Sequence, residues 1–316
     1  MKNTLTKLIS SPKIFSYTVM WMIILVFFGT LAQKDIGLYE SQMRYFSSYF
    51  FLLGGFIPLP GGRLVLLIMT INLAASLFKK NLWKVKKTGI IIVHLGGLLL
   101  LLGGGVTALF SSEGNMVIAE GETSNHVDDY FDMELAFVNT SRDDSLEYTV
   151  FDAPLLNDGN SITYEDFGIQ IDIISHMENV RIESRISPAE KIYKGFLKEF
   201  VLLPLRPEKE ATQNRPGIII KLSGLSSEKD GIYGIFLGQK TPDTFQINGD
   251  LYFTEFRRKR TYLPFSISLL DFEKIMHPGT NVAKSYSSEV NLIENSIPRR
   301  ILIQMNEPLR HQNYTF

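Results

Sequence analysis

The chain has 316 residues, of which 45% are hydrophobic, and a formal net charge of −1 at pH 7. This charge argues against nucleic-acid binding, which usually needs a basic surface. The absence of cysteine excludes disulfides, thiol catalysis, Cys-ligated metals and c-type haem attachment to this chain. Apolar runs gather in residues 1–110, so we expect a transmembrane region there and a soluble domain over 111–316.

Three apolar runs predict transmembrane helices over about 14–33, 62–78 and 88–110. A helix needs about 20 mostly apolar residues to cross the bilayer, which the first and third runs supply. The second run is short, but the charge on both sides of it requires a return crossing. A cleavable signal peptide is the alternative for the first run, but the run is long and no small-residue cleavage site follows it.

Lysines predict the orientation of these helices, because positively charged segments stay in the cytoplasm. They precede the first helix and fill the linker between the second and third, at Lys2, Lys7, Lys13, Lys79, Lys80, Lys84, Lys86 and Lys87. We therefore expect a multi-pass protein of the inner (cytoplasmic) membrane with a cytoplasmic N-terminus. The domain over 111–316 is then periplasmic or otherwise extracytoplasmic.

The first outer loop is rich in aromatic residues over Arg44–Phe56. Their spacing predicts a short helix with the aromatic rings on one side. Aromatic rings favour the depth of the lipid headgroups, so this helix is expected to lie in the outer interface. Packing of the helix on its own bundle is an equally good interpretation.

A single histidine, His94, lies in the third apolar run, and no acidic residue lies in any of the three. An ionisable group at this depth normally faces protein or water and has a partner. Three roles remain open: a neutral structural histidine, a proton relay, and an axial ligand of haem iron, with other metals as a further possibility. The glycine pairs Gly96/Gly103 and Gly97/Gly104 form a small-residue stripe that suits close helix packing or a flat ligand.

Alternating hydrophobicity after residue 111 predicts a mostly-β domain, either a sandwich or an open barrel-like sheet. Strands are expected around 167–173, Gly217–Leu222 and 263–269, with a hairpin at Asn248-Gly249. No catalytic motif is recognisable, and the four histidines of this part, His126, His176, His277 and His311, have no assigned role. The basic run 257–260 is interpreted as a solvated strand edge, with contact to anionic lipid or haem propionates as the alternative.

Several separated motifs resemble the ResB/CcsB family of cytochrome c biogenesis membrane proteins. They are FFGTLAQ (Phe27–Gln33), PLPGGR (Pro58–Arg63), INLAAS (Ile71–Ser76), GIIIVHLGGLLLLLGGGVT (Gly89–Thr107), EGNMVIAEGE (Glu113–Glu122), LPFSISLLDFEKIMHPGT (Leu263–Thr280), SYSSEV (Ser285–Val290) and NEPLRHQNYTF (Asn306–Phe316). Each fragment alone is weak, but their order and spacing together are specific to the family.

This resemblance implies a subunit that holds and exports haem b for attachment to apocytochrome c. His94 falls on the family's intramembrane histidine, so it is expected to be one axial ligand of the haem iron. The other ligand would come from a CcsA/ResC-like membrane partner, since no other histidine lies in the three spans. The chain is expected to end before the family's last transmembrane helix, and not to perform haem attachment alone.

The remaining alternatives are a membrane scaffold and a sensor. In the scaffold, His94 is structural and the outer β domain docks the partner subunit or the apocytochrome. A sensor is disfavoured because no kinase, cyclase or DNA-binding module is recognisable on the cytoplasmic side.

Overall fold

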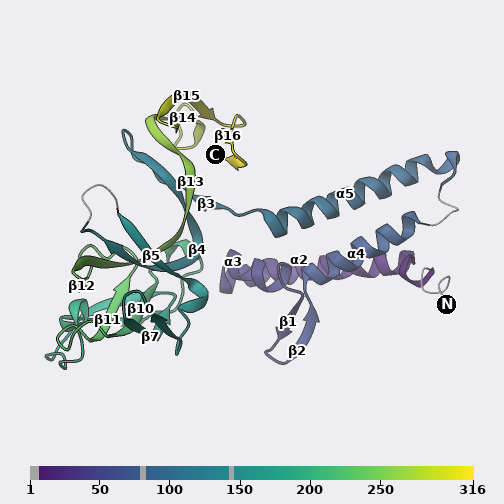
Figure 1. The fold of residues 1–316 in the computed structure, drawn as a ribbon. Coiled ribbons are helices and arrows are strands. Elements are labelled where there is room, and N and C mark those ends of the chain that lie inside the picture. Colours follow the sequence, from purple (N-terminus) through teal and green to yellow (C-terminus); the bar gives the residue numbers. More distant parts are fainter. Residues whose placement is uncertain (1–6, 79–82, 142–145) are drawn as a thin grey trace. The chain divides into compact units, whose positions relative to one another are not determined.

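The computed structural model describes residues 7–78, 83–141 and 146–316 (Figure 1). The chain divides into two compact units. Met1–Ser112 and Arg206–Asn214 form the first, called here the helical unit. Glu113–Leu205 and Arg215–Phe316 form the second, called here the β unit. Of the expected cytoplasmic lysines, Lys2, Lys79 and Lys80 lie outside the described residues.

Three apolar helices, α2 (Pro12–Ile36), α4 (Gly62–Leu77) and α5 (Thr88–Phe110), dominate the helical unit. Pro12–Ile36 and Val85–Phe110 are long and apolar enough to cross a membrane. Helix α4 has 16 residues. At about 1.5 Å per residue it is about 24 Å long, shorter than the roughly 30 Å of a hydrocarbon core. Two of the expected spans thus have candidate helices of sufficient length, and the third stays a prediction.

The helix predicted over Arg44–Phe56 is wrong. After α3 (Leu38–Ser41) and a π-helical turn (Gln42–Phe46), the chain forms an antiparallel hairpin of β1 (Phe50–Leu53) and β2 (Ile57–Pro60) (Figure 1). Gly54 and Gly55 turn the hairpin with φ of 63° and 86°, a conformation that other residues rarely adopt. Two prolines in β2 also lack the amide hydrogens that a helix requires.

Polar contacts tie α2 to the rest of the helical unit. The side-chain amide of Asn72 in α4 is buried and donates to the carbonyl oxygens of Ile9 and Ser11, at 2.5 and 3.0 Å. The indole Nε1 of Trp21 donates to the carbonyl oxygen of Pro60 at 2.9 Å. In an apolar environment the loss of such a bond is costly in free energy, because the polar group would stay buried without a partner.

The β unit is mostly β, as predicted, and contains two principal sheets. One has the order β11-β10-β7-β6, and the other has the order β15-β14-β13-β4-β3, with β12 and β5 pairing at its side. The strands of these sheets are β3 (Gly114–Asn115), β4 (Thr123–Asn139), β5 (Glu147–Asp152), β6 (Ser161–Tyr164), β7 (Ile169–Met177), β10 (Gly217–Ser223), β11 (Gly231–Phe236), β12 (Thr244–Ile247), β13 (Asp250–Met276), β14 (Ala283–Glu294) and β15 (Ile297–Gln304). Smaller pairs are formed by β8 (Val180–Ser184) with β9 (Phe200–Pro204) and by β16 (Arg310–His311) with β17 (Tyr314–Thr315).

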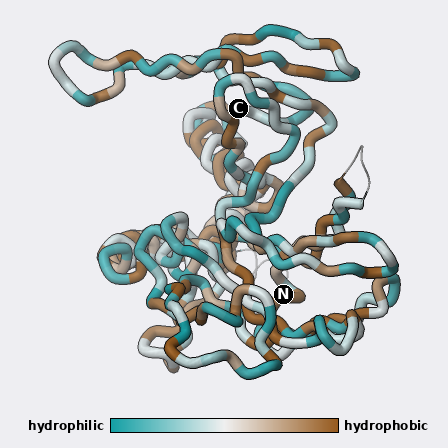
Figure 2. The backbone as a smooth tube through the Cα atoms, turned by 90° about the vertical axis from the view of Figure 1, so that its left-hand side faces the viewer, coloured by the Kyte–Doolittle hydropathy of each residue, from teal (hydrophilic) through white to brown (hydrophobic). Residues whose placement is uncertain are grey.

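The two principal sheets pack face to face as a β-sandwich. Hydrophobic and hydrophilic residues alternate along parts of the backbone (Figure 2). Apolar side chains of both sheets meet in one buried cluster that includes Phe137, Ile171, Ile220 and Phe256. The hairpin at Asn248-Gly249 is confirmed, since both residues have positive φ between β12 and β13.

Strand β13 is long enough to serve two hydrophobic cores. Its first part, with Tyr252 and Phe256, belongs to the sandwich core, while Leu263, Phe265 and Ile267 belong to a second core with residues of β14. Its pairing with β4 shifts register between Arg258 and Arg260 and again between Tyr262 and Ile267. Such bulges bend a strand, which lets one strand reach both cores.

Candidate functional site

His94 lies on the one face of α5 that is partly covered. The half-buried residues of the helix recur at helical spacing, at Ile91, His94, Gly97, Leu98 and Leu101. Helix α5 contains no fully buried residue. This face approaches α4, because a Cβ added at Gly97 would lie 3.2 Å from Cδ2 of Leu73 in that helix. The histidine is therefore on the face of α5 that packs in the helical unit.

The His94 ring is held by its own helix. Its Nδ1 lies 2.8 Å from the carbonyl oxygen of Ile90. A carbonyl oxygen only accepts hydrogen bonds, so the proton of the neutral ring is assigned to Nδ1. The lone pair of Nε2 is then available to a metal, and a backbone carbonyl on the opposite nitrogen is a common way to orient a metal-binding histidine. The donor chemistry fits one axial ligand of haem iron.

The glycine stripe divides into a packed and an open part. Gly97 is used where α4 and α5 approach, whereas a Cβ at Gly96, Gly103 or Gly104 would meet no described atom within 4 Å. Small residues beside open space allow a flat ligand or another helix to come close. The stripe thus contributes to packing at one position and leaves the others accessible.

A second histidine that could bind haem iron is not found among the described residues of the helical unit. Among its described residues, His94 is the one histidine. The part of the chain that the structure describes also contains no cluster of three or more His, Asp or Glu that could hold a metal. A haem held by His94 and a second histidine would therefore need that second histidine from outside this unit.

The four histidines of the β unit lie on separate elements. His126 is in β4, His176 in β7 and His311 in β16, and His277 follows β13. Burial is the main cause that lowers the pKa of His126 and of His176, which favours neutral rings. His311 contacts the Phe265 ring and lies 3.4 Å from Glu294. These environments suit structural roles.

The basic run 257–260 is not a solvated strand edge, contrary to the expectation. It lies inside β13, and Arg257 is only 4% exposed. Its Nε donates to the buried Glu134 at 2.8 Å and its Nη1 donates to Glu255 at 2.9 Å. Burial alone would lower the pKa of Arg257, but hydrogen bonds and charges of the two glutamates raise it overall. Sequence alone could not reveal this pair, because Glu134 lies on another strand.

Apolar helices that carry a lone histidine, followed by a β-sandwich unit, define a candidate membrane protein with a substantial non-membrane domain. The model of the ResB-like family matches residues 79–182, a stretch that includes His94. Over this stretch the chain is similar to the ResB-like family, which supports the resemblance seen in the motifs, and this similarity suggests a role in cytochrome c biogenesis. No curated protein matches the chain.

Proposed function

We propose that this chain is the membrane subunit of a cytochrome c maturation complex that holds haem b through His94 and exports it for attachment to apocytochrome c. The observation that carries the proposal is the geometry of His94. Its Nδ1 faces the carbonyl oxygen of Ile90, which leaves Nε2 as a metal ligand within an apolar helix. The ResB-like family match over the same helix supports this choice of metal group.

Membrane insertion of α2, α4 and α5 is part of the proposal. Large apolar side chains of α5 remain highly exposed within the chain, among them Val93 at 72%, Leu99 at 66% and Leu100 at 79%. Such a surface is unfavourable in water and suits lipid or partner helices. Lys13 lies in the first turn of α2, and three lysines precede α5, at Lys84, Lys86 and Lys87. These positive charges favour a cytoplasmic position for the N-terminal ends of both helices. The β unit then lies on the extracytoplasmic, periplasmic side.

The chain's own residues would bind and orient the haem, and would not attach it. Nε2 of His94 would occupy one axial position, and the bond from Nδ1 to Ile90 would fix the ring. Haem supplies the vinyl groups that form thioethers with apocytochrome cysteines. The second axial ligand and the attachment site would come from a CcsA/ResC-like partner, and apocytochrome c would be the acceptor.

A membrane scaffold is the second candidate function, and one observation favours it. Nδ1 of His94 already has a hydrogen-bond partner in its own helix, so the ring is partly satisfied without any ligand. In that case the β unit would dock the partner subunit or the apocytochrome, and haem would be bound elsewhere in the complex.

Replacement of His94 by Ala in the complex with its CcsA/ResC-like partner distinguishes the two functions. Leu98→Ala is the matched control, because Leu98 lies on the same face of α5 one turn later. We expect the purified His94→Ala complex to lose most of its haem and the cells to lose cytochrome c, with both retained in the control. Equal haem content and equal cytochrome yield in the two variants would exclude the haem-ligand role of His94 and favour the scaffold function.

A further inference from the structure

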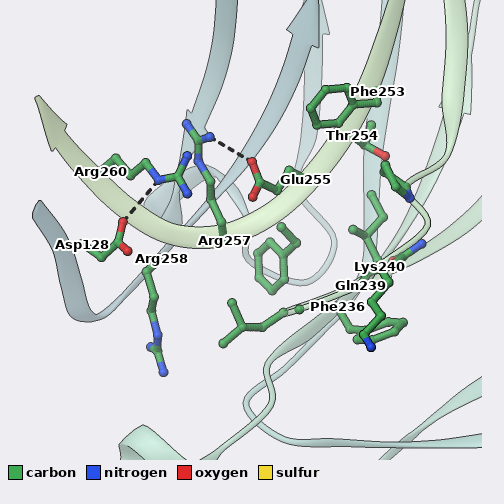
Figure 3. Close-up of a pocket in the computed structure, with 15 residues that line it drawn as sticks. Asp128, Phe236, Gln239, Lys240, Phe253, Thr254, Glu255, Arg257, Arg258 and Arg260 are labelled. Carbon is green, nitrogen blue, oxygen red and sulfur yellow. Dashed lines mark hydrogen bonds and ion pairs between the residues drawn. The ribbon is translucent and has the colours of Figure 1, made fainter. Parts of the chain in front are cut away.

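A cavity of about 420 Å³ lies in the β unit beside β13 (Figure 3). The end of β11 and the segment after it, Ile235–Lys240, line it opposite Thr254–Arg258. Alternate residues of a strand share a face, so Thr254, Phe256 and Arg258 are placed on the same side of β13. Phe256 belongs to the sandwich core, and this side of the strand therefore faces inward.

Among the described residues, Arg258 is the cation of the basic run for which no carboxylate partner is found. Arg257 pairs with Glu134, Lys259 with Asp152 at 3.1 Å, and Arg260 with Asp128 at 3.2 Å. The guanidinium of Arg258 donates to the carbonyl oxygen of Phe131 at 2.9 Å, and no ion pair is found for it within residues 7–78, 83–141 and 146–316.

Partial burial makes this arrangement of Arg258 costly. Loss of hydration on burial is the largest effect on the pKa of Arg258 and lowers it. The negative charges of Asp129 and Asp128 raise this pKa by less. A guanidinium has five donor hydrogens in a planar fork, and one backbone acceptor leaves most of them for a ligand. A bound anion would offset the desolvation and accept these hydrogens.

Unpaired polar atoms at the other side of the cavity also indicate a ligand. Thr254 is 1% exposed, and its Oγ1 has no hydrogen-bond partner in the described structure. Oε1 of Gln239, another lining residue, is buried and equally unpaired there. Buried polar atoms normally have partners. Thr254 and Arg258 are four residues apart, or about 13 Å along a strand, with Phe256 between them.

We propose that this cavity binds an organic anion with an apolar body, whose carboxylate or phosphate lies at Arg258. The apolar body contacts Phe256 and Ile235, and a polar group at its far end meets Thr254 and Gln239. Lys240 adds a further positive charge to the lining, whereas Arg260 is paired there with Asp128 and Glu255 is paired with Arg257. The cavity is lined by residues of the β unit and His94 belongs to the helical unit, so this proposal does not rest on haem binding.

Titration calorimetry on the purified full chain in detergent tests this site. The probes are hexanoate, hexyl phosphate and the neutral analogue 1-hexanol. We expect both anions to bind and 1-hexanol to bind at least about tenfold more weakly, because a neutral hydroxyl cannot form the charge-assisted hydrogen bonds that a carboxylate or phosphate forms with a guanidinium. The stronger of the two anions identifies the head group as a carboxylic acid or a phosphate ester.

Arg258→Gln is expected to weaken anion binding at least about tenfold, and Arg258→Lys less than Arg258→Gln. Lys259→Gln is the matched control, because this neighbouring cation pairs with Asp152 and is expected to leave binding unchanged. His94→Ala is also expected to leave it unchanged. The proposal is overturned if neither anion binds, or if Arg258→Gln and Lys259→Gln bind the anions equally well.

Discussion

Replacement of Glu134 by Gln tests whether Arg257 is a structural cation of the β unit. Both side chains are 4% exposed, and Nε of Arg257 lies 2.8 Å from Oε1 of Glu134. Gln keeps the shape of the side chain and an acceptor oxygen, but removes its negative charge. Arg257 would then depend on Glu255, whose side chain is 37% exposed.

The cost follows from the burial of the pair. Removal of one partner from a buried ion pair typically destabilises a protein by about 3–5 kcal/mol, because the other charge stays buried without compensation. Glu255 and the amide oxygen of Gln offset part of this loss. We therefore expect Glu134→Gln to lower the free energy of unfolding by about 2–3 kcal/mol.

Urea unfolding of the full chain in detergent, followed by the circular dichroism of the β-sheet signal, measures this change. Asp152→Asn is the matched control, since it breaks the Lys259 pair on the same stretch of β13. Those side chains are 39% and 50% exposed, so the expected loss is about 0–1 kcal/mol. Equal losses in the two variants, or a loss below about 0.5 kcal/mol for Glu134→Gln, would refute the structural role of Arg257.

Three further changes test other parts of the structure. Burial raises the pKa of Asp243 to about 6, so the folded protein holds this proton to a higher pH than the unfolded chain does. The free energy of unfolding therefore decreases as the pH rises from about 4 through 6. Asp243→Asn should remove about 2 kcal/mol of this pH dependence in urea titrations at pH 4 and 7. Asn72→Leu removes both hydrogen bonds to backbone carbonyls and should lower the free energy of unfolding by about 2 kcal/mol. Tryptophan fluorescence of the protein unfolding in detergent solution measures this change. Gly97→Leu crowds Leu73 and should lower the free energy of unfolding, measured in the same way, by about 1–3 kcal/mol. Gly104 lies beside open space, so Gly104→Leu should change this free energy little.

Local patterns in the sequence predicted the elements that depend on local chemistry. The length of the apolar runs predicted α2 and α5, and the turn preference of Asn248-Gly249 predicted the hairpin between β12 and β13. His94 was found because an ionisable residue is conspicuous in an apolar run. Its free Nε2 needed the structure, since the tautomer follows from the contact with Ile90.

Features that depend on distant residues could not be predicted in this way. The hairpin over 50–60 is different because its turn is local: the aromatic spacing suggested a helix, and the turn signal of Gly54-Gly55 was overlooked. The basic run was interpreted as a solvated strand edge because charged residues at an edge discourage unwanted strand pairing. The partner of Arg257 is Glu134, which is 123 positions away in the sequence. The cavity at Arg258 likewise forms only when β13 and the end of β11 come together.

The haem-ligand role of His94 is tested most directly by the absorption spectrum of the complex that carries His94→Gly, recorded with and without imidazole. A glycine at this position removes the ring and leaves space in which free imidazole can take the place of the side chain. The haem-ligand role predicts that haem absorbance is lost in the variant and returns, with the bands of six-coordinate low-spin haem, when imidazole is added. A full haem spectrum in the variant without imidazole would contradict it.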